Sequence, residues 1–500
     1  MMNNKKIYRL FVYNLVVFLS VFSFCCEKEK QALSPQVQPE DSQTLKSRLA
    51  LNTVEDTETG LKSSTGTFAV FENRSARKGR MIHLNVVVLH AEGPETRPDP
   101  FFVFAGGPGA DVTTYRFMYE KSWIRKMRDI VLVSQRGTSG DNKIDCPEAA
   151  PSDDLQSYFS PYFKEALFRS CIEELKLKFD LTQYSTYHAA DDVNDIRRAL
   201  NYDKINITGS SYGTRMALVY LRKHPETVRT AILNGVAPLA FRNPLYHAPG
   251  FQRAIDMLIE ECSEDPDCRA AFPSLKQEYK AILARLEKEP VEVTVRHPET
   301  HKESRVRMPK EAFIEALRMY MYGSVSSRHV PYLIHRAYEG DFQPFAEAGL
   351  ASEWAVRRAL AVGMLLCVTC AEDLDRITWE DIKEITGNTD MGSGRVTRQK
   401  KVCDFWPRSE LPENFDDPFA VDVPVLLLSG SLDPVTPPQW GEEVASHLPN
   451  SLHLVVPGAH GVGGPCLQFI QKQFLESGSL KELNISCVDK IKTRPFRVKE

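Results

Sequence analysis

The sequence lacks the features that mark nucleic-acid-binding, repeat and metal-dependent proteins. Its 500 residues carry a formal net charge of only −4 and no basic stripe, so we expect no nucleic-acid partner. No segment recurs at a fixed period, which argues against a solenoid or a propeller. It has no H-E-x-x-H pair, no P-loop and no G-x-G-x-x-G fingerprint, so we expect no metal and no cofactor.

The apolar run near the N-terminus, residues 10–24, is short for a permanent membrane-spanning helix. It follows three basic residues, Lys5, Lys6 and Arg9. This order predicts an export signal over residues 1–26, and thus a protein of the periplasm or cell envelope, or a secreted one. Lipidation at Cys25 or Cys26 would supply the only membrane contact, although Phe24 is larger than the residue that usually precedes a lipidated cysteine. Simple cleavage and an uncleaved anchor are the alternatives.

Nine cysteines remain besides Cys25 and Cys26: Cys146, Cys171, Cys262, Cys268, Cys367, Cys370, Cys403, Cys466 and Cys487. An exported chain meets an oxidising compartment, where disulfides persist. Nine is odd, so at least one thiol is free or pairs between molecules, and several could be buried thiols; spacing does not decide the connectivity. Cys367-x-x-Cys370 has metal or redox spacing but lacks a second paired motif, which favours a disulfide cysteine beside a buried thiol.

Short apolar runs alternate with segments of helical spacing in the first half of the chain. We expect strands at residues 81–90, 101–105, 130–133, 205–208 and 230–233, and helices at 191–200 and 212–223. Further strands are expected at 423–428 and 452–456, before a helix at 466–476. Strands that alternate with helices predict an α/β fold with a mostly parallel sheet flanked by helices.

The pattern divides the chain into segments. Residues 27–65 are polar, and their composition predicts a linker, so ordered structure is expected to begin near Gly66. Residues 66–240 and 401–500 form the two parts of the core. Between them, residues 241–400 lose the strand–helix order and predict an inserted, mainly helical cap. Its clearest helices are 254–261, 275–286, 310–321 and 354–366, with a β-rich exception at 291–306.

The strongest local motif is Gly209-Ser210-Ser211-Tyr212-Gly213, a G-x-S-x-G pattern. Alone it is weak, but it follows a predicted strand and opens a predicted helix, which is the context of a nucleophile elbow. Glycine avoids backbone collisions in so tight a turn. The pattern predicts Ser211 as a nucleophile, which needs a histidine base and an acid that orients the histidine.

Both partners follow late strands in the order that the α/β-hydrolase fold uses. Asp433 lies just past the strand at 423–428, and His460 lies just past the strand at 452–456. A turn aspartate and an ordinary loop histidine are the alternatives, but both together after Ser211 predict a catalytic triad of Ser211, Asp433 and His460.

An oxyanion hole needs two backbone N–H groups. Tyr212, directly after the serine, is the first candidate, and Gly107 in the loop of residues 106–109 (G-G-P-G) is the second. A mere tight turn is the alternative for this loop.

These residues resemble the tripeptidyl aminopeptidase and proline iminopeptidase group of α/β-hydrolases. The segments that carry the resemblance are residues 106–109, 129–137 (D-I-V-L-V-S-Q-R-G), 211–214 (S-Y-G-T) and 432–437 (L-D-P-V-T-P). It runs from about residue 66 to 490 and is weakest over 275–365. The chain differs from proline iminopeptidases at Ala105, where they have histidine, and at Ser134, where they have aspartate.

The resemblance implies a serine aminopeptidase whose cap limits access to short or N-terminal peptide segments. It also implies four disulfides, Cys262–Cys268, Cys466–Cys487, Cys370–Cys403 and Cys146–Cys171, with Cys367 as the odd thiol. A cleft that recognises a free peptide N-terminus needs carboxylates that face its ammonium group. Glu372 and Asp373 in the cap are the candidates, with solvated surface acids as the alternative.

Two other functions stay open. A carboxylesterase would use the same triad on small esters, since acyl transfer is the same for amides and esters. A catalytically silent binding lipoprotein would need neither the triad nor the glycine loop.

Overall fold

The computed structural model describes residues 40–57, 59–146, 149 and 151–499. The predicted export signal, including Cys25 and Cys26, lies outside these residues. Among the described residues, no helix combines the length and apolar character needed to cross a membrane.

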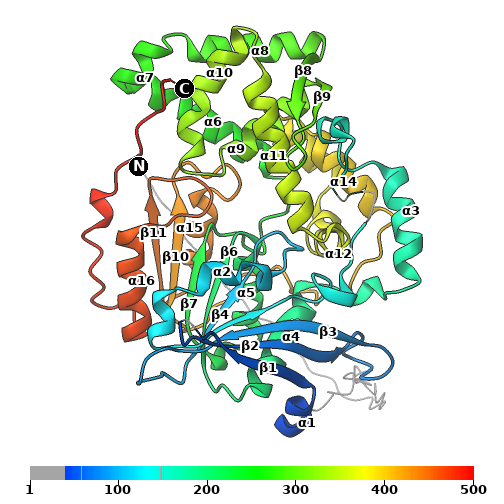
Figure 1. Ribbon diagram of the computed structural model, residues 1–500, viewed down its shortest axis with the longest axis vertical. Helices are drawn as coiled ribbons and strands as arrows, with labels where there is room; N and C mark the ends of the chain where they lie inside the picture. Colours follow the sequence, from blue (N-terminus) through cyan, green and yellow to red (C-terminus); the bar gives the residue numbers. More distant parts are fainter. Residues whose placement is uncertain (1–39, 58, 147–148, 150, 500) are drawn as a thin grey trace, which may run out of the picture. The chain divides into compact units, whose positions relative to one another are not determined.

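A nine-stranded sheet forms the centre of the fold, with the strand order β1-β2-β3-β5-β4-β6-β7-β10-β11 (Figure 1). β1, β2, β3 and β5 pair antiparallel, and the strands from β5 to β11 along the sheet pair parallel. The bounds are β1 Leu49–Glu55, β2 Lys62–Phe71, β3 Met81–Leu89, β4 Phe101–Phe104, β5 Ile130–Val133, β6 Ile205–Ser210, β7 Val228–Asn234, β10 Val425–Gly430 and β11 Ser451–Val456. The mostly parallel α/β sheet expected from the sequence is thus confirmed.

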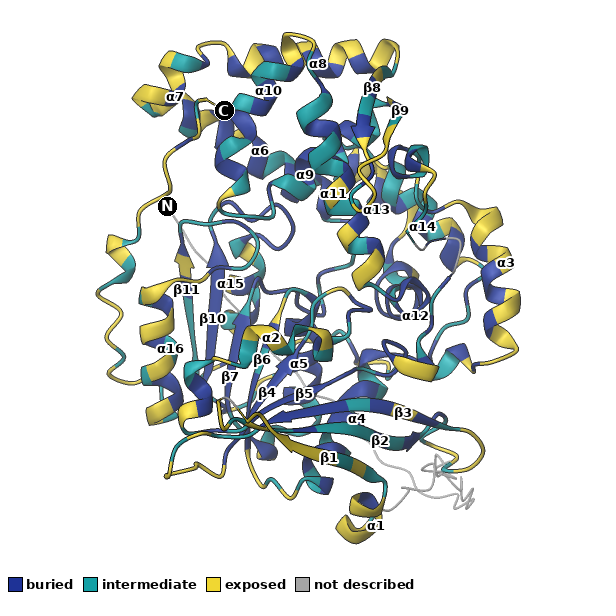
Figure 2. Cartoon of the chain, in the orientation of Figure 1, coloured by how far each residue is buried: buried dark blue, intermediate teal, exposed yellow. Residues whose placement is uncertain are grey.

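The sheet is buried on both faces, as the dark blue of its central strands shows (Figure 2). In β10, Val425 and Leu427 pack into one hydrophobic cluster, and Leu426 and Leu428 pack into another. Successive side chains of a strand point to opposite faces, so a strand covered on both sides is apolar throughout. Helices supply covering side chains on both faces, among them α4 Thr186–Ala199, α5 Tyr212–Lys223 and α15 Pro438–His447 for the first cluster, and α16 Pro465–Ser477 for the second. Two further helices of this part of the chain are α2 Arg116–Tyr119 and α3 Glu165–Lys176.

Ordered structure begins earlier than the sequence indicated. The segment expected to be a linker up to residue 65 holds α1 Ser42–Ser47, which the side chain of Asp41 caps at Thr44 N, and then β1. β1 is an edge strand, and most of its residues are exposed. An exposed edge strand needs few apolar side chains, which is why its composition resembled that of a linker.

The mainly helical insertion is confirmed. Between β7 and β10 lie α6 His247–Glu264, α7 Pro266–Ala271, α8 Leu275–Lys288, α9 Lys310–Tyr320, α10 Val330–Tyr338 and α11 Gln343–Ala359. The β-rich exception is a hairpin of β8 Val291–Arg296 and β9 Glu303–Met308. These elements share a hydrophobic cluster of their own, with Phe251, Phe313 and Phe345 in it.

The helix predicted over residues 354–366 is two helices. α11 ends at Ala359 and α12 Val362–Glu372 begins after a break, because Leu360 forms an isolated β-bridge with Ala110 and Ala361 N donates to Gly109 O at 2.9 Å. Buried residues of α12, α13 Trp379–Thr386 and α14 Gly394–Cys403 belong to the cluster on the sheet face, not to that of the cap. The last part of the predicted cap therefore packs with the sheet.

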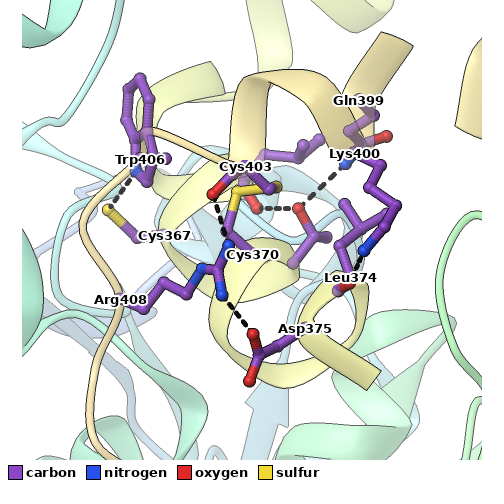
Figure 3. The surroundings of a disulfide bond; sticks show 11 residues. Cys367, Cys370, Leu374, Asp375, Gln399, Lys400, Cys403, Trp406 and Arg408 are labelled. Carbon is purple, nitrogen blue, oxygen red and sulfur yellow. Dashed lines mark hydrogen bonds and ion pairs between the residues drawn. A yellow bond between two sulfur atoms is a disulfide. The ribbon is translucent and has the colours of Figure 1, made fainter. Parts of the chain in front are cut away.

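All four disulfides implied by the resemblance are present: Cys146–Cys171, Cys262–Cys268, Cys370–Cys403 and Cys466–Cys487. Cys367 is the free cysteine of the described part of the chain, and Trp406 Nε1 lies 3.4 Å from its Sγ (Figure 3). Burial raises the pKa of this thiol to about 12. Disulfides persist in oxidising compartments, so the four bonds indicate an extracytoplasmic protein.

Candidate active site

Ser211 occupies the sharp turn between β6 and α5. Its φ of 56° and ψ of −128° are rare for a residue with a side chain. A Cβ at Gly209 would stand 2.0 Å from Gly213 O, and a Cβ at Gly213 would stand 2.3 Å from Phe104 O. Both glycines of the motif are therefore required by their neighbours. The turn presents Ser211 to a cavity that the side chain helps to line.

Asp433 and His460 form a hydrogen-bonded pair past the ends of β10 and β11. His460 Nδ1 lies 2.9 Å from Asp433 Oδ2, and Asp433 is fully buried. Burial acts to raise the pKa of Asp433. Its pKa is nevertheless below the ordinary value because of the charge and hydrogen bond of His460 and the N–H groups of Val435 and Thr436. Asp433 is thus an anion that holds the histidine ring.

The pair lies beside the serine turn. Ser211 N donates to Asn234 O at 3.0 Å, and a Cβ at the next residue, Gly235, would stand 3.3 Å from His460 Cε1. Among the hydrogen bonds of the described residues, none joins Ser211 Oγ to His460. Such bonds are often long in unliganded hydrolases and tighten when substrate binds.

Two residues that sequence reasoning missed hold the histidine loop. The Asn234 side chain donates to Val462 O at 2.7 Å and accepts from Val462 N at 3.0 Å, which ties the loop to the end of β7. From the cap, Tyr322 O accepts from His460 N at 3.0 Å, and the Tyr322 ring lies 5.0 Å from the imidazole, centroid to centroid. No local pattern marks either residue, since their roles depend on distant segments.

The oxyanion candidates lie at the same edge of the sheet. Tyr212 is the first residue of α5, where backbone N–H groups are free of intrahelical partners. A Cβ at Gly106 would stand 3.3 Å from Ser211 Cβ, and Gly107 has a φ of +119°. Gly106 and Gly107 line the cavity beside Ser211, so the glycine loop is close to the serine.

A cavity of about 740 Å³ lies between the serine turn and the inserted helices. Aromatic side chains form part of its wall: Tyr115, Tyr158, Phe159, Tyr162, Phe163, Phe241 and Tyr322. Within the described residues, its charged wall groups are Arg215, Arg318, Arg395, Arg398, Glu311, Glu315 and Glu353. This volume is in the range of small-molecule and peptide sites, roughly 300–1,000 Å³. As for a metal, the described residues include no cluster of three or more His, Cys, Asp or Glu side chains placed to hold one.

The structure does not place Glu372 and Asp373 on this wall. Both are fully buried at the end of α12. Glu372 accepts from Thr186 N at 2.6 Å and from Thr186 Oγ1 at 2.8 Å, and Asp373 pairs with Arg215 Nη1 at 2.8 Å. The expectation that they face a substrate ammonium is therefore wrong. Their acidic pair belongs to a helix packed inside the core, where burial raises the pKa of Glu372 to about 7.

Two segments of this chain match known protein families. Residues 100–274 match the alpha/beta hydrolase fold family, and residues 389–487 match the TAP-like protein family. The serine protease Hip1 of Mycobacterium tuberculosis is 26% identical over 338 residues, which cover 63% of this chain and 64% of that protein. The putative hydrolase YuaR of Escherichia coli is 20% identical over 343 residues, 63% of this chain and 62% of that protein. The match thus spans less than two thirds of these relatives.

Among solved structures, the proline iminopeptidase of Mycobacterium smegmatis is 14% identical, with 83% of this chain and 98% of that chain covered at a TM-score of 0.39. The sheet order, the strand–turn–helix at Ser211 and the two family matches agree with one another. The chain is an α/β-hydrolase with a TAP-like C-terminal segment.

Proposed function

We propose that this protein is a serine hydrolase in which Ser211 is the nucleophile, His460 the base and Asp433 the acid that orients it. The Asp433–His460 hydrogen bond beside the strained Ser211 turn carries the proposal. Because Nδ1 of His460 is engaged by Asp433, Nε2 is the nitrogen left to act on Ser211.

The reaction proceeds through an acyl-enzyme. As Ser211 Oγ attacks the carbonyl carbon, its proton passes to His460 Nε2, and the N–H groups of Tyr212 and Gly107 stabilise the oxyanion. His460 then gives the proton to the leaving group, and the bond to that group breaks. Water repeats the sequence on the acyl-enzyme and releases the acid.

We propose further that the substrates are peptides with a free N-terminus, from which short N-terminal pieces are released. The inserted helices bound the cavity on the side away from the sheet, which favours short segments over folded chains. The similarity to a protein named serine protease supports a peptide over an ester.

Glu353 on α11 is the carboxylate we propose for the substrate ammonium group. The other two cavity glutamates are engaged, Glu311 by Arg398 and Glu315 by Arg318 at 2.8 Å. Among the described residues, the one ion-pair partner of Glu353 is Arg357 Nε, at 3.6 Å. A carboxylate without a close partner on a cavity wall suits an incoming cation.

The cellular place that we propose is the periplasm, the envelope or the medium, with export directed by residues 1–26. A lipid at Cys25 or Cys26 is part of this proposal. Mass spectrometry of the mature N-terminus from the native host tests it, since a cleaved, unmodified end would rule out the lipid.

Hydrolysis of a small substrate panel tests the function. The panel holds tripeptide p-nitroanilides with free and acetylated N-termini, a proline p-nitroanilide and a short acyl p-nitrophenyl ester. We expect cleavage of the free-amine peptides and little of the acetylated ones. Ser211→Ala should lower kcat/KM by about 10⁶-fold. Ser210→Ala, a neighbouring exposed serine, is the matched control and should keep activity.

Each other outcome has a meaning. Cleavage of the ester alone would make the protein an esterase. Activity that survives Ser211→Ala would refute the triad. Failure of a serine-directed phosphonate to label Ser211 would favour a silent binding protein.

A further inference from the structure

Arg395 is the cavity cation with the least engaged guanidinium. Its neighbour Glu315 is bound to Arg318 Nε at 2.8 Å, whereas Arg395 Nη1 lies 3.6 Å from the other oxygen of that carboxylate. Arg395 Nε is buried and has no hydrogen-bond partner among the described residues. A guanidinium has five N–H donors and no acceptor, so this group has unused capacity for an anion.

Four more polar atoms of residues on the same wall lack partners within the described chain. They are Arg215 Nε, His247 Nδ1, Arg398 Nε and Gln399 Oε1. His247 is 6% exposed and Gln399 is 1% exposed. Buried polar atoms are nearly always hydrogen-bonded, so the wall around Arg395 is unusual in the number of polar groups that the described residues leave unsatisfied.

His247 also locates this group of residues relative to the catalytic centre. Burial, and after it the positive charges of Arg395, Arg318 and His460, lowers the pKa of His247 well below its ordinary value. Arg395, Arg318 and His460 therefore each lie within electrostatic range of His247. Contacts also link Arg318 to the catalytic histidine, since Arg318 Nη1 donates to the Tyr322 hydroxyl at 2.6 Å and Tyr322 packs on His460.

The helix that bears Arg395 adds to the positive potential. Arg395 lies in the first turn of α14, Arg398 lies one turn later, and the helix start has no side-chain cap. A helix N-terminus favours negative charge. The far end of α14 is fixed, because Cys403 is bonded to Cys370 on α12 and Gln399 Nε2 donates to Thr369 Oγ1 (Figure 3). The guanidinium groups thus project from a well-anchored helix.

We propose that Arg395, with Arg398 beside it, binds a substrate carboxylate in this cavity, so that the enzyme selects peptides that carry an acidic group near the cleaved bond. This inference rests on the proposed peptidase function and names its substrate class. Glu353 would bind the ammonium group of the peptide and Arg395 would bind its carboxylate. The cavity would therefore recognise both charged groups of the substrate. A neutral or basic group would leave the Arg395 donors unpaired and desolvated.

Matched substrates test the selection. Free-amine tripeptide p-nitroanilides would be made with Glu or Gln at each position in turn. Wild type should prefer Glu at one position by about 10- to 100-fold in kcat/KM, the range for one hydrogen bond to a charged group. Arg395→Gln should reduce the ratio to about 2 or less. Arg296→Gln, on the exposed hairpin strand β8, should leave it unchanged. Equal rates for Glu and Gln at every position in wild type would overturn the inference while leaving the peptidase proposal intact.

Binding distinguishes the two sources of a carboxylate and does not depend on catalysis. Three tripeptides would be titrated into Ser211→Ala by calorimetry: one with Glu and a C-terminal amide, one with Gln and a free C-terminus, and one with Gln and an amide. Tighter binding of the first peptide would show that Arg395 binds an acidic side chain. Tighter binding of the second would show that it binds the C-terminal carboxylate. Equal binding of all three overturns the subsite. If wild type cleaves only esters, the peptidase proposal fails, and this comparison still decides whether Arg395 binds a carboxylate.

Discussion

Asp433 accepts hydrogen bonds from Val435 N, Thr436 N, Thr436 Oγ1 and His460 Nδ1, at 2.8 to 2.9 Å. Thr436 Oγ1 also lies 3.2 Å from His460 Nδ1. One hydroxyl therefore contacts both members of the pair, which gives Thr436 a part in orienting the imidazole.

Replacement of Thr436 by valine tests this role. Valine keeps the shape but removes the hydroxyl, so the imidazole loses one of the groups that fix its orientation. We expect kcat/KM to fall about tenfold, the effect of losing one hydrogen bond of roughly 1 kcal/mol or slightly more. Thr436→Ser, which keeps the hydroxyl, should restore most of the activity. Unchanged kinetics in the valine variant would show that the backbone N–H groups alone hold Asp433.

Residues whose role depends on a local pattern could be predicted from the sequence, and the others could not. Ser211, Asp433 and His460 each follow a strand in a recognisable order. Tyr322 lies in the turn after α9 and Glu353 lies in α11, and both reach the site only through the packing of the insertion. The prediction for Glu372 and Asp373 was wrong because the sequence of two adjacent acidic residues does not show whether they are exposed or buried in the core.

At the scale of the element, the turn between β6 and α5 depends on the absence of two Cβ atoms. In Gly209→Ala, the new atom would meet Gly213 O at 2.0 Å, a backbone atom that cannot move without shifting α5. We expect destabilisation of more than about 3 kcal/mol and loss of activity. Thermal unfolding and hydrolysis rates would measure both.

Gly463 provides the control for this change. A Cβ there meets nothing within 4 Å, and its backbone is not in the left-handed region. Gly463→Ala should stay within about 0.5 kcal/mol of wild type. Equal stability of the two variants would mean that the turn relaxes more easily than its contacts indicate.

The presence of a strand or helix was easier to predict from the sequence than the residues at which it begins and ends. The buried strands β4, β5 and β10 contain continuous apolar runs and were recognisable as such. The break between α11 and α12 was not, because Leu360 and Ala361 pair with Ala110 and Gly109, which lie about 250 positions earlier in the chain. Helical periodicity carries no information on so distant a partner.

For the whole molecule, the carboxyl of Glu372 makes stability depend on pH. Burial raises its folded pKa to about 7 from the ordinary glutamate value of 4.5. The folded state thus holds this proton more tightly than the unfolded state does. The resulting stabilisation is full below pH 4.5 and is lost as pH rises through about 7.

Glu372→Gln should remove this dependence, because the amide keeps an acceptor for Thr186 N and carries no charge. We expect the unfolding free energy of wild type to fall, relative to the variant, by up to about 3 kcal/mol between pH 4.5 and pH 8. Urea titrations at several pH values, with the disulfides intact, would measure the difference. Parallel curves for the two proteins would contradict the raised pKa.

Two of the contacts between the insertion and the catalytic centre are backbone hydrogen bonds: Ala361 N donates to Gly109 O, and Tyr322 O accepts from His460 N. One contact supports the glycine loop and the other supports the histidine loop. A cap acquired by recombination would have to match backbone at both points to leave the catalysis intact. Divergence of substrate range in this lineage is therefore expected to proceed by single substitutions on the cavity wall rather than by exchange of whole caps.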